Sequence, residues 1–105
     1  MLFLDCGANY GYWSILASSK IFGSQNVISV EPLKSNFEIL RKNNKLNNYR
    51  INLYNYALGK KRGKGLIYFS NNAKSNVGAS LQYTKDKKNN KESVKITTID
   101  NIISK

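Results

Sequence analysis

The 105-residue chain has no histidine, one cysteine, one proline and only six acidic residues. Without histidine, it has neither an imidazole base nor a histidine-ligated metal site. A single cysteine excludes an internal disulfide and suits a reducing compartment. No apolar run approaches the roughly 20 residues that cross a bilayer, and no secretory signal precedes the first predicted strand. We therefore expect a cytoplasmic protein that does not enter a membrane.

Basic residues are abundant: 17 Lys and Arg against the six acids give a formal charge of +11. A charge of this size attracts nucleic acid or anionic lipid. The many Lys, Asn, Ile and Tyr residues, whose codons are AT-rich, explain the basicity equally well. The lysines are scattered, with local runs only in "GKKRGKG" and "KDKKNNK". A nucleic-acid partner is therefore possible but not favoured.

Apolar runs and helical periodicities alternate along the first sixty residues. Strands are predicted at residues 1–6, 26–32 and 51–59, and helices at residues 11–22 and 35–48. The second helix is expected to begin with a capping box formed by Ser35 and Glu38. This β-α-β-α-β order predicts an α/β fold with a parallel sheet and right-handed crossovers.

The pattern changes after Gly59. Two further strands are predicted at residues 65–70 and 93–100, and a short helix in residues 99–104. The polar stretch at residues 71–92 is expected to be a loop with a hairpin, in which Ser80 begins a strand. We therefore expect an added β-hairpin region after the third strand of the parallel sheet.

Two strand ends carry residues that indicate a ligand. The first strand ends in Asp5, and Gly7, Asn9 and Gly11 follow, which allow a tight turn, close backbone approach and free amide donors at a helix start. Glu31 stands 20 residues after Gly11, where a carboxylate accepts hydrogen bonds from both ribose hydroxyls. Each feature also has a simpler explanation: the glycines can serve only to turn the chain, and Glu31 can serve only to complement the dipole of the next helix. Together they favour a nucleotide-type cofactor.

The spacing of this loop bears on which cofactor it holds. A dinucleotide requires Gly-x-Gly-x-x-Gly, whereas Asn9 replaces the central glycine here and would crowd a pyrophosphate. S-adenosylmethionine instead presents a carboxylate and an amine, which backbone amides and a carboxamide can bind. The loop therefore favours the methyl donor over NAD.

Five blocks of the sequence resemble those of the FkbM-type S-adenosylmethionine-dependent methyltransferases: "FLDCGANYGYWS", "VISVEPLKSNFEILRKNNKLNN", "NLYNYALG", "GASL" and "VKITTIDNII". The resemblance covers nearly the whole chain and implies one Rossmann-like domain of the class I methyltransferase type over residues 1–105. The family continues with a strand similar to "LKIDVEG", so we expect a truncated domain that keeps the cofactor-binding half. Its first strand would then be an apolar edge prone to aggregate.

The resemblance assigns residues to each part of S-adenosylmethionine. It places Asp5, Gly7, Ala8, Asn9 and Gly11 at the methionine portion, Glu31 and the adjacent Pro32 at the ribose, and Asn55, Tyr56 and Ala57 at the adenine. No metal is implied.

Neighbouring residues invite other roles. Tyr10, Tyr12 and Trp13 follow the loop and suit stacking on a ligand, but at a helix start we expect them to pack against the sheet. Cys6 lacks a histidine partner, so we interpret it as a packing residue rather than a nucleophile.

The resemblance implies methyl transfer to oxygen, typically a hydroxyl of a sugar or a small natural product. A general base would have to be a carboxylate or a tyrosine, and the sequence identifies none. Two alternatives stay open. One is an RNA methyltransferase, because the second-helix block is similar to that of tRNA methyltransferases, although no "NPPY"-like signature is present. The other is a non-catalytic remnant of a truncated domain.

Overall fold

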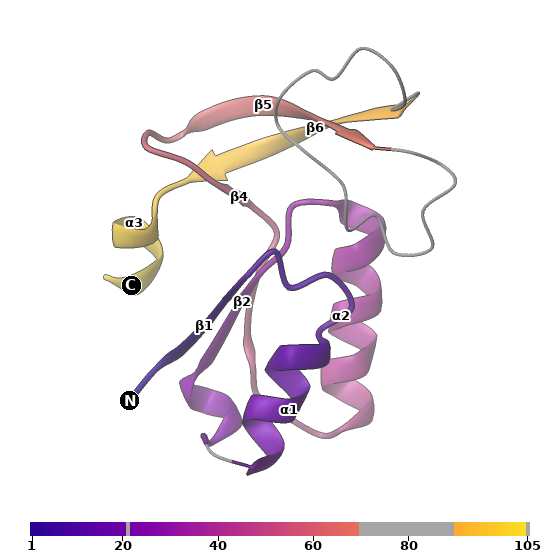
Figure 1. The fold of residues 1–105 in the computed structure, drawn as a ribbon, viewed down its shortest axis with the longest axis vertical. Helices are drawn as coiled ribbons and strands as arrows, with labels where there is room; N and C mark the ends of the chain where they lie inside the picture. Colours follow the sequence, from indigo (N-terminus) through magenta and orange to yellow (C-terminus); the bar gives the residue numbers. More distant parts are fainter. Residues whose placement is uncertain (21, 70–89, 105) are drawn as a thin grey trace.

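The computed structural model describes residues 1–20, 22–69 and 90–104, which form two small sheets and their helices (Figure 1). The first sheet is parallel and has the order β1-β2-β3, from β1 (Phe3–Cys6), β2 (Val27–Val30) and β3 (Asn52–Tyr54). The second has the order β4-β6-β5, from β4 (Ala57–Leu58), β5 (Gly63–Phe69) and β6 (Asn90–Thr97). The helices are α1 (Tyr12–Lys20), α2 (Lys34–Leu46) and α3 (Ile99–Ile103), with a 3-10 turn at Ser24–Asn26.

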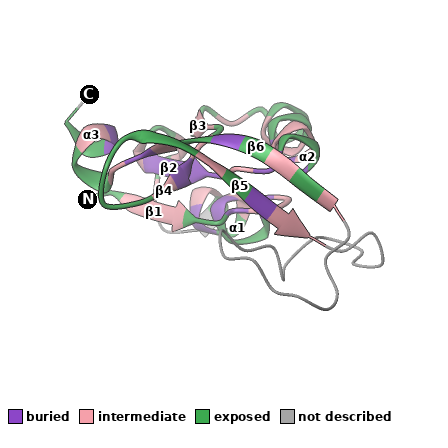
Figure 2. Ribbon diagram, turned by 90° about the horizontal axis from the view of Figure 1, so that it is seen from above, coloured by how far each residue is buried: buried purple, intermediate pink, exposed green. Residues whose placement is uncertain are grey.

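The parallel sheet and its alternation with α1 and α2 confirm the predicted α/β order. Strand β2 is buried along its whole length (Figure 2), as its apolar, β-branched run indicates. Its side chains alternate between the two faces of the sheet. Val27 packs with Ala17 of α1 on one face, and Ile28 and Val30 pack with Ile102 of α3 on the other. The candidate site therefore rests on a strand with core on both sides.

The prediction of one continuous strand at residues 51–59 is wrong, because the structure has two separate strands there, β3 and β4. Strand β3 pairs with β2, whereas β4 belongs to the second sheet and pairs with β6. The chain turns at Asn55, whose side-chain amide donates to the carbonyl oxygens of Glu31 at 2.8 Å and Pro32 at 3.0 Å. These two hydrogen bonds fix the interruption between β3 and β4 beside the C-terminal end of β2.

The predicted capping box at the start of α2 is also wrong. The helix begins at Lys34, and its N-cap residue, Leu33, makes no side-chain capping bond. Glu38 instead pairs with Arg41 on the surface, with 3.0 Å between nitrogen and oxygen. Carboxylates outside the helix accept its first amides, because Leu33 N–H donates to Glu31 and Lys34 N–H donates to Glu92.

The hairpin region is confirmed in part. Strands β5 and β6 pair antiparallel, and β6 begins at Asn90, three residues before the predicted start. Residues 70–89, which include Ser80 and most of the polar stretch, lie outside the described residues. The predicted short helix is α3, where Thr98 Oγ1 accepts the Asn101 N–H at 3.1 Å.

Strand β1 stands at one edge of the parallel sheet and, among the described strands, pairs with β2 alone. Met1 and Leu2 beside it are exposed, with fractions of 95% and 54%. The predicted apolar edge is therefore present. No helix in the described ranges has the length and apolarity that a membrane crossing requires.

Candidate functional site

The chain leaves β1 through a tight turn at residues 7–11, here called the glycine loop. Gly7, Asn9 and Gly11 have φ angles of +70°, +56° and +94°, all in the left-handed region that favours Gly and Asn. A Cβ at Gly11 would lie 2.5 Å from Leu40 Cδ1 of α2, whereas a Cβ at Gly7 would meet no atom within 4 Å. Gly11 is therefore needed for packing, and Gly7 borders open space.

The amides of the glycine loop bind the end of the neighbouring strand. Gly7 N–H and Ala8 N–H both donate to Val30 O, at 2.8 and 3.0 Å. Asn9 N–H donates to Glu31 Oε1 at 2.7 Å, and Gly11 N–H donates to Ala8 O at 2.9 Å. The expectation of free amide donors at Gly7, Asn9 and Gly11 is therefore wrong. Because β1 and β2 are parallel neighbours, the loop leaving β1 crosses acceptors at the end of β2.

The side-chain oxygen of Asn9 has no hydrogen-bond partner, unlike its backbone N–H. Its Oδ1 atom is buried, and it is the one buried side-chain polar atom in the described residues that has no hydrogen-bond partner. An acceptor that loses water without gaining a donor costs about 1–3 kcal/mol. The Asn9 carboxamide oxygen is therefore an acceptor that no donor in the described residues satisfies.

Glu31 connects the glycine loop to the start of α2. Its Oε1 accepts from Asn9 N–H at 2.7 Å and its Oε2 accepts from Leu33 N–H at 2.9 Å. The side chain of Asn36, which is itself buried, adds a third hydrogen bond. Glu31 is only 4% exposed. The structure thus brings together the loop and the acid, as their positions at two strand ends predict.

The burial of Glu31 leads to a prediction about pH. Burial raises its pKa above the ordinary value of 4.5, and the bonds from Leu33, Asn9 and Asn36 oppose the rise. The folded state therefore holds the proton of Glu31 more tightly than the unfolded chain does. Protonation of Glu31 thus stabilises the fold fully below about pH 4.5, and this contribution is lost as the pH rises through the raised pKa. We expect the unfolding free energy of Glu31→Gln, from urea denaturation, to fall less steeply with pH than that of the wild type. Parallel profiles would contradict this.

Asp5 is held in place by two buried serines that the sequence analysis missed. Ser14 Oγ of α1 donates to Asp5 Oδ2 at 2.7 Å and also hydrogen-bonds to Ser29 Oγ of β2. Both serines are fully buried. The available signal was a polar residue within the apolar run "VISV". The network fixes the Asp5 carboxylate against the first turn of α1.

Pro32, predicted at the ribose, and the three residues predicted at the adenine separate into two groups. Pro32, Asn55 and Tyr56 line a cavity of about 390 Å³, whose remaining lining residues are Lys34 of α2 and four residues of β6. Ala57 lies instead in the hydrophobic core with Leu33. Tyr10 and Gly11 of the glycine loop line another hollow, of about 480 Å³, between α1 and α2, together with Ile15, Ser19 and Asn43.

Tyr12, Trp13 and Cys6 lie in other surroundings than the sequence predicts. Tyr12 and Trp13 do not pack against the sheet: they are 70% and 61% exposed and contact each other edge to face, because Ser14 and Ala17 occupy the sheet-facing side of α1. Cys6 is exposed rather than packed. Partial burial and the neighbouring Asp5 raise the pKa of its thiol, which opposes nucleophilic reactivity.

No group of three or more metal-binding side chains gathers in the part of the chain that the structure describes. A family model described as the methyltransferase FkbM domain matches residues 5–105. The matched segment includes Asp5, the glycine loop, Glu31 and all strands except the first two residues of β1. Searches of curated proteins and of solved structures found no match.

Proposed function

Because this chain belongs to the methyltransferase FkbM domain family, we propose that it is an S-adenosylmethionine-dependent methyltransferase acting on a hydroxyl oxygen of a sugar or small natural product. Residues 1–105 would form one domain, in which the parallel sheet corresponds to the Rossmann-like sheet of a class I methyltransferase. The order β1-β2-β3 and the placement of Asp5 and Glu31 at adjacent strand ends support this fold.

The unpartnered Asn9 Oδ1 is the observation on which the cofactor proposal depends. The ammonium group of a methionine portion has N–H donors and no acceptor, so it matches a buried carboxamide oxygen. The open space beside Gly7 leaves room for a ligand to approach the loop. The residues present therefore fit the amino-acid end of S-adenosylmethionine.

Glu31 and the adjacent cavity complete the proposed site. Each carboxylate oxygen accepts one backbone amide in the structure, and a carboxylate oxygen has two lone pairs. With the bond from the Asn36 side chain counted, three of about four lone-pair sites of Glu31 are occupied, and one is left for a ribose hydroxyl. The cavity lined by Pro32, Asn55 and Tyr56 has a volume of about 390 Å³, which is within the range of small-molecule sites, and we assign it to the adenine.

When bound, S-adenosylmethionine supplies a methyl group on a positively charged sulfur atom. The contribution of this chain is to bind and orient the donor, and such positioning accounts for a large part of the rate of group-transfer reactions. Asn9 and Glu31 bind through acceptors that are already fixed by the loop and by α2. Ser14 keeps Asp5 in its place beside them.

The Asn9→Gly variant tests the cofactor proposal. Glycine tolerates the positive φ and keeps the N–H that binds Glu31, so the loop is retained while Oδ1 is removed. We expect the affinity for S-adenosylhomocysteine, measured by calorimetry, to fall about tenfold, with no loss of stability because an unsatisfied buried acceptor disappears.

The matched control is Asn48→Gly, which replaces the other described asparagine with positive φ, at +59° after α2. Asn48 is exposed and lies outside the proposed site. Its substitution should leave the affinity unchanged. Equal affinities of wild type and Asn9→Gly would contradict the role assigned to Asn9, and a wild-type chain that releases no heat with S-adenosylhomocysteine would support the non-catalytic alternative.

A further inference from the structure

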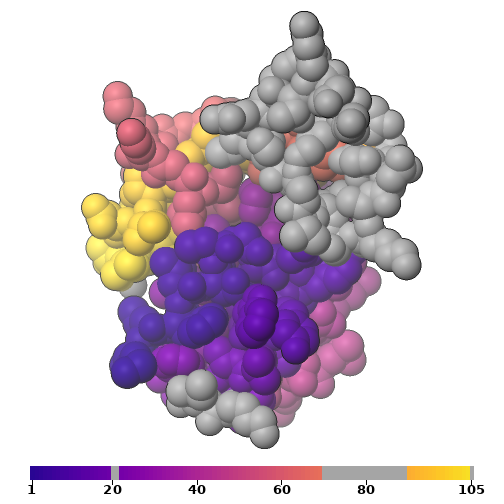
Figure 3. Space-filling view, viewed as in Figure 1, coloured from indigo at the N-terminus to yellow at the C-terminus, as the bar shows by residue number. Residues whose placement is uncertain are grey.

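A second cavity, of about 580 Å³, opens against the small sheet. It shares Tyr56 and Lys95 with the cavity assigned to the adenine, and none of its lining residues belongs to the glycine loop. Its lining residues belong to β5, β6 and α3 and to the residues just before β4 and β5. They are Tyr56, Arg62, Gly63, Lys64, Lys95, Ile96, Thr97 and Asn101. Figure 3 shows the turn before β5 next to the C-terminal part of the chain at one end of the molecule. The cavity therefore lies where the hairpin meets α3.

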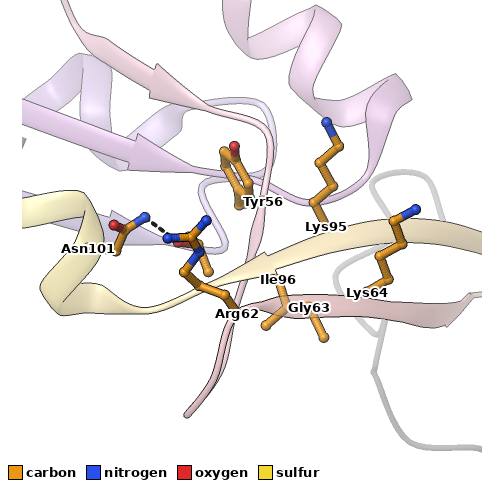
Figure 4. A pocket seen from close by; sticks show the side chains of 8 residues that line it. Tyr56, Arg62, Gly63, Lys64, Lys95, Ile96 and Asn101 are labelled. Atoms are coloured by element: carbon orange, nitrogen blue, oxygen red, sulfur yellow. Dashed lines mark hydrogen bonds between the residues drawn. The ribbon is translucent and has the colours of Figure 1, made fainter.

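The charged groups around this cavity all have the same sign. Arg62, Lys64 and Lys95 line it, and the described lining residues include no Asp or Glu. Lys64 and Lys95 are directly opposite each other in the antiparallel pair, and their side chains extend to the same side of the strands (Figure 4). Like charges at opposite positions destabilise a sheet. An anion bound between them would relieve this repulsion.

Polar groups are fixed at the other side of the cavity. Asn101 Nδ2 donates to Thr97 Oγ1 at 2.9 Å, and Figure 4 shows the Arg62 side chain extending toward Asn101. Thr97 is 2% exposed, so this pair is held by the surrounding packing. A hydroxyl that accepts such a bond still carries a proton that can be donated to an anion. Cationic and neutral donors thus face the same space.

We propose that this cavity binds the phosphate group of a small phosphorylated ligand. Arg62 supplies a planar guanidinium that can form two parallel bonds to phosphate oxygens, and the two lysines add point charges. The volume of about 580 Å³ is within the range of small-molecule sites. Arg62, Lys64 and Lys95 converge on one cavity of limited volume, which favours a small ligand over a nucleic-acid strand. The site does not require the methyl donor.

Titration of the apo chain with inorganic pyrophosphate, followed by NMR of its backbone amides, tests this site. Saturable shifts are expected at residues 62–64, 95–97 and 101. The Lys64→Gln/Lys95→Gln variant should fold, because it removes a repulsion, and should bind pyrophosphate at least about tenfold more weakly. Thermal denaturation verifies folding, and S-adenosylhomocysteine is left out, so failure of the methyl-donor site would not affect the result.

The matched control is Lys42→Gln/Lys45→Gln, which removes the same charge from another basic hollow, of about 560 Å³, on α2. Its affinity for pyrophosphate should change by less than about twofold, the small effect expected of distant, screened charges. Equal losses in both double variants, or no saturable binding of pyrophosphate to the wild type, would overturn the proposal. Binding of a short single-stranded RNA without binding of pyrophosphate would also overturn it and would identify a nucleic-acid surface.

Discussion

Replacing Glu31 with alanine is expected to lower the free energy of unfolding by about 3 kcal/mol, because two buried amides lose their acceptor at about 1–3 kcal/mol each. These are the amides of Asn9 and Leu33, which the carboxylate joins across the loop and the start of α2. Asn36 loses a partner as well. The free energy is measured by urea denaturation at neutral pH.

The control for Glu31→Ala is Glu38→Ala. Glu38 forms a surface ion pair with Arg41, and both side chains are well exposed, at 44% and 64%. Such pairs contribute about 0–1 kcal/mol, so this control should change the unfolding free energy only slightly. If the two variants were equally stable, Glu31 would not be the link between the loop and α2. Glu31→Gln keeps the size of the side chain and one of the two acceptor oxygens, so it should lose less stability than Glu31→Ala.

Gly11→Ala is expected to lower the free energy of unfolding by about 2–4 kcal/mol, since it combines a strained φ with overpacking. The φ angle is +94°, and the added Cβ would lie 2.5 Å from Leu40 Cδ1. Leu40 is fully buried, so it has little space to move away. Chemical denaturation of the purified variant measures the loss.

Gly63→Ala is the matched control for Gly11→Ala. A Cβ at Gly63 meets no atom within 4 Å, and its φ lies outside the left-handed region. The control should change stability by no more than about 0.5 kcal/mol. In addition, Gly11→Ala and Leu40→Ala should be less than additive when combined, because removing the Leu40 side chain removes the overlap. If Gly11→Ala and Gly63→Ala lowered the free energy of unfolding equally, the glycine loop would not pack closely against α2.

The sequence was sufficient to predict the parallel sheet and the meeting of its strand ends. Short apolar runs that end in Asp5 and near Glu31, separated by helical periodicity, leave few other arrangements. The added hairpin was also predictable, since strand patterns continue after Gly59. These features depend on local patterns of neighbouring residues, which explains why they could be identified without the structure.

Other features depend on residues far apart in the chain. The break between β3 and β4 arises from Asn55 binding a carbonyl 24 residues earlier. The first helical amide of α2, on Lys34, binds Glu92, which is 58 residues later. No short window contains either pair, so an uninterrupted strand and a local capping box were the natural predictions.

The amides of the glycine loop show the same limitation at the site itself. The local sequence predicts a turn with backbone N–H donors, but it does not reveal that Val30 O accepts hydrogen bonds from two of them. The group left without a partner is then the Asn9 side-chain oxygen rather than these backbone amides. Ser14 escaped notice for a similar reason, since its partners Asp5 and Ser29 come from two different strands.

The most direct test of the proposed cofactor site is NMR of the ¹⁵N-labelled chain during titration with S-adenosylhomocysteine. We predict the largest amide shifts at residues 7–11 and at Glu31, with smaller ones at Asn55 and Tyr56 along the adjacent cavity. Shifts confined to the hollow between α1 and α2, at Ile15, Ser19 and Asn43, would contradict the site, as would an unchanged spectrum.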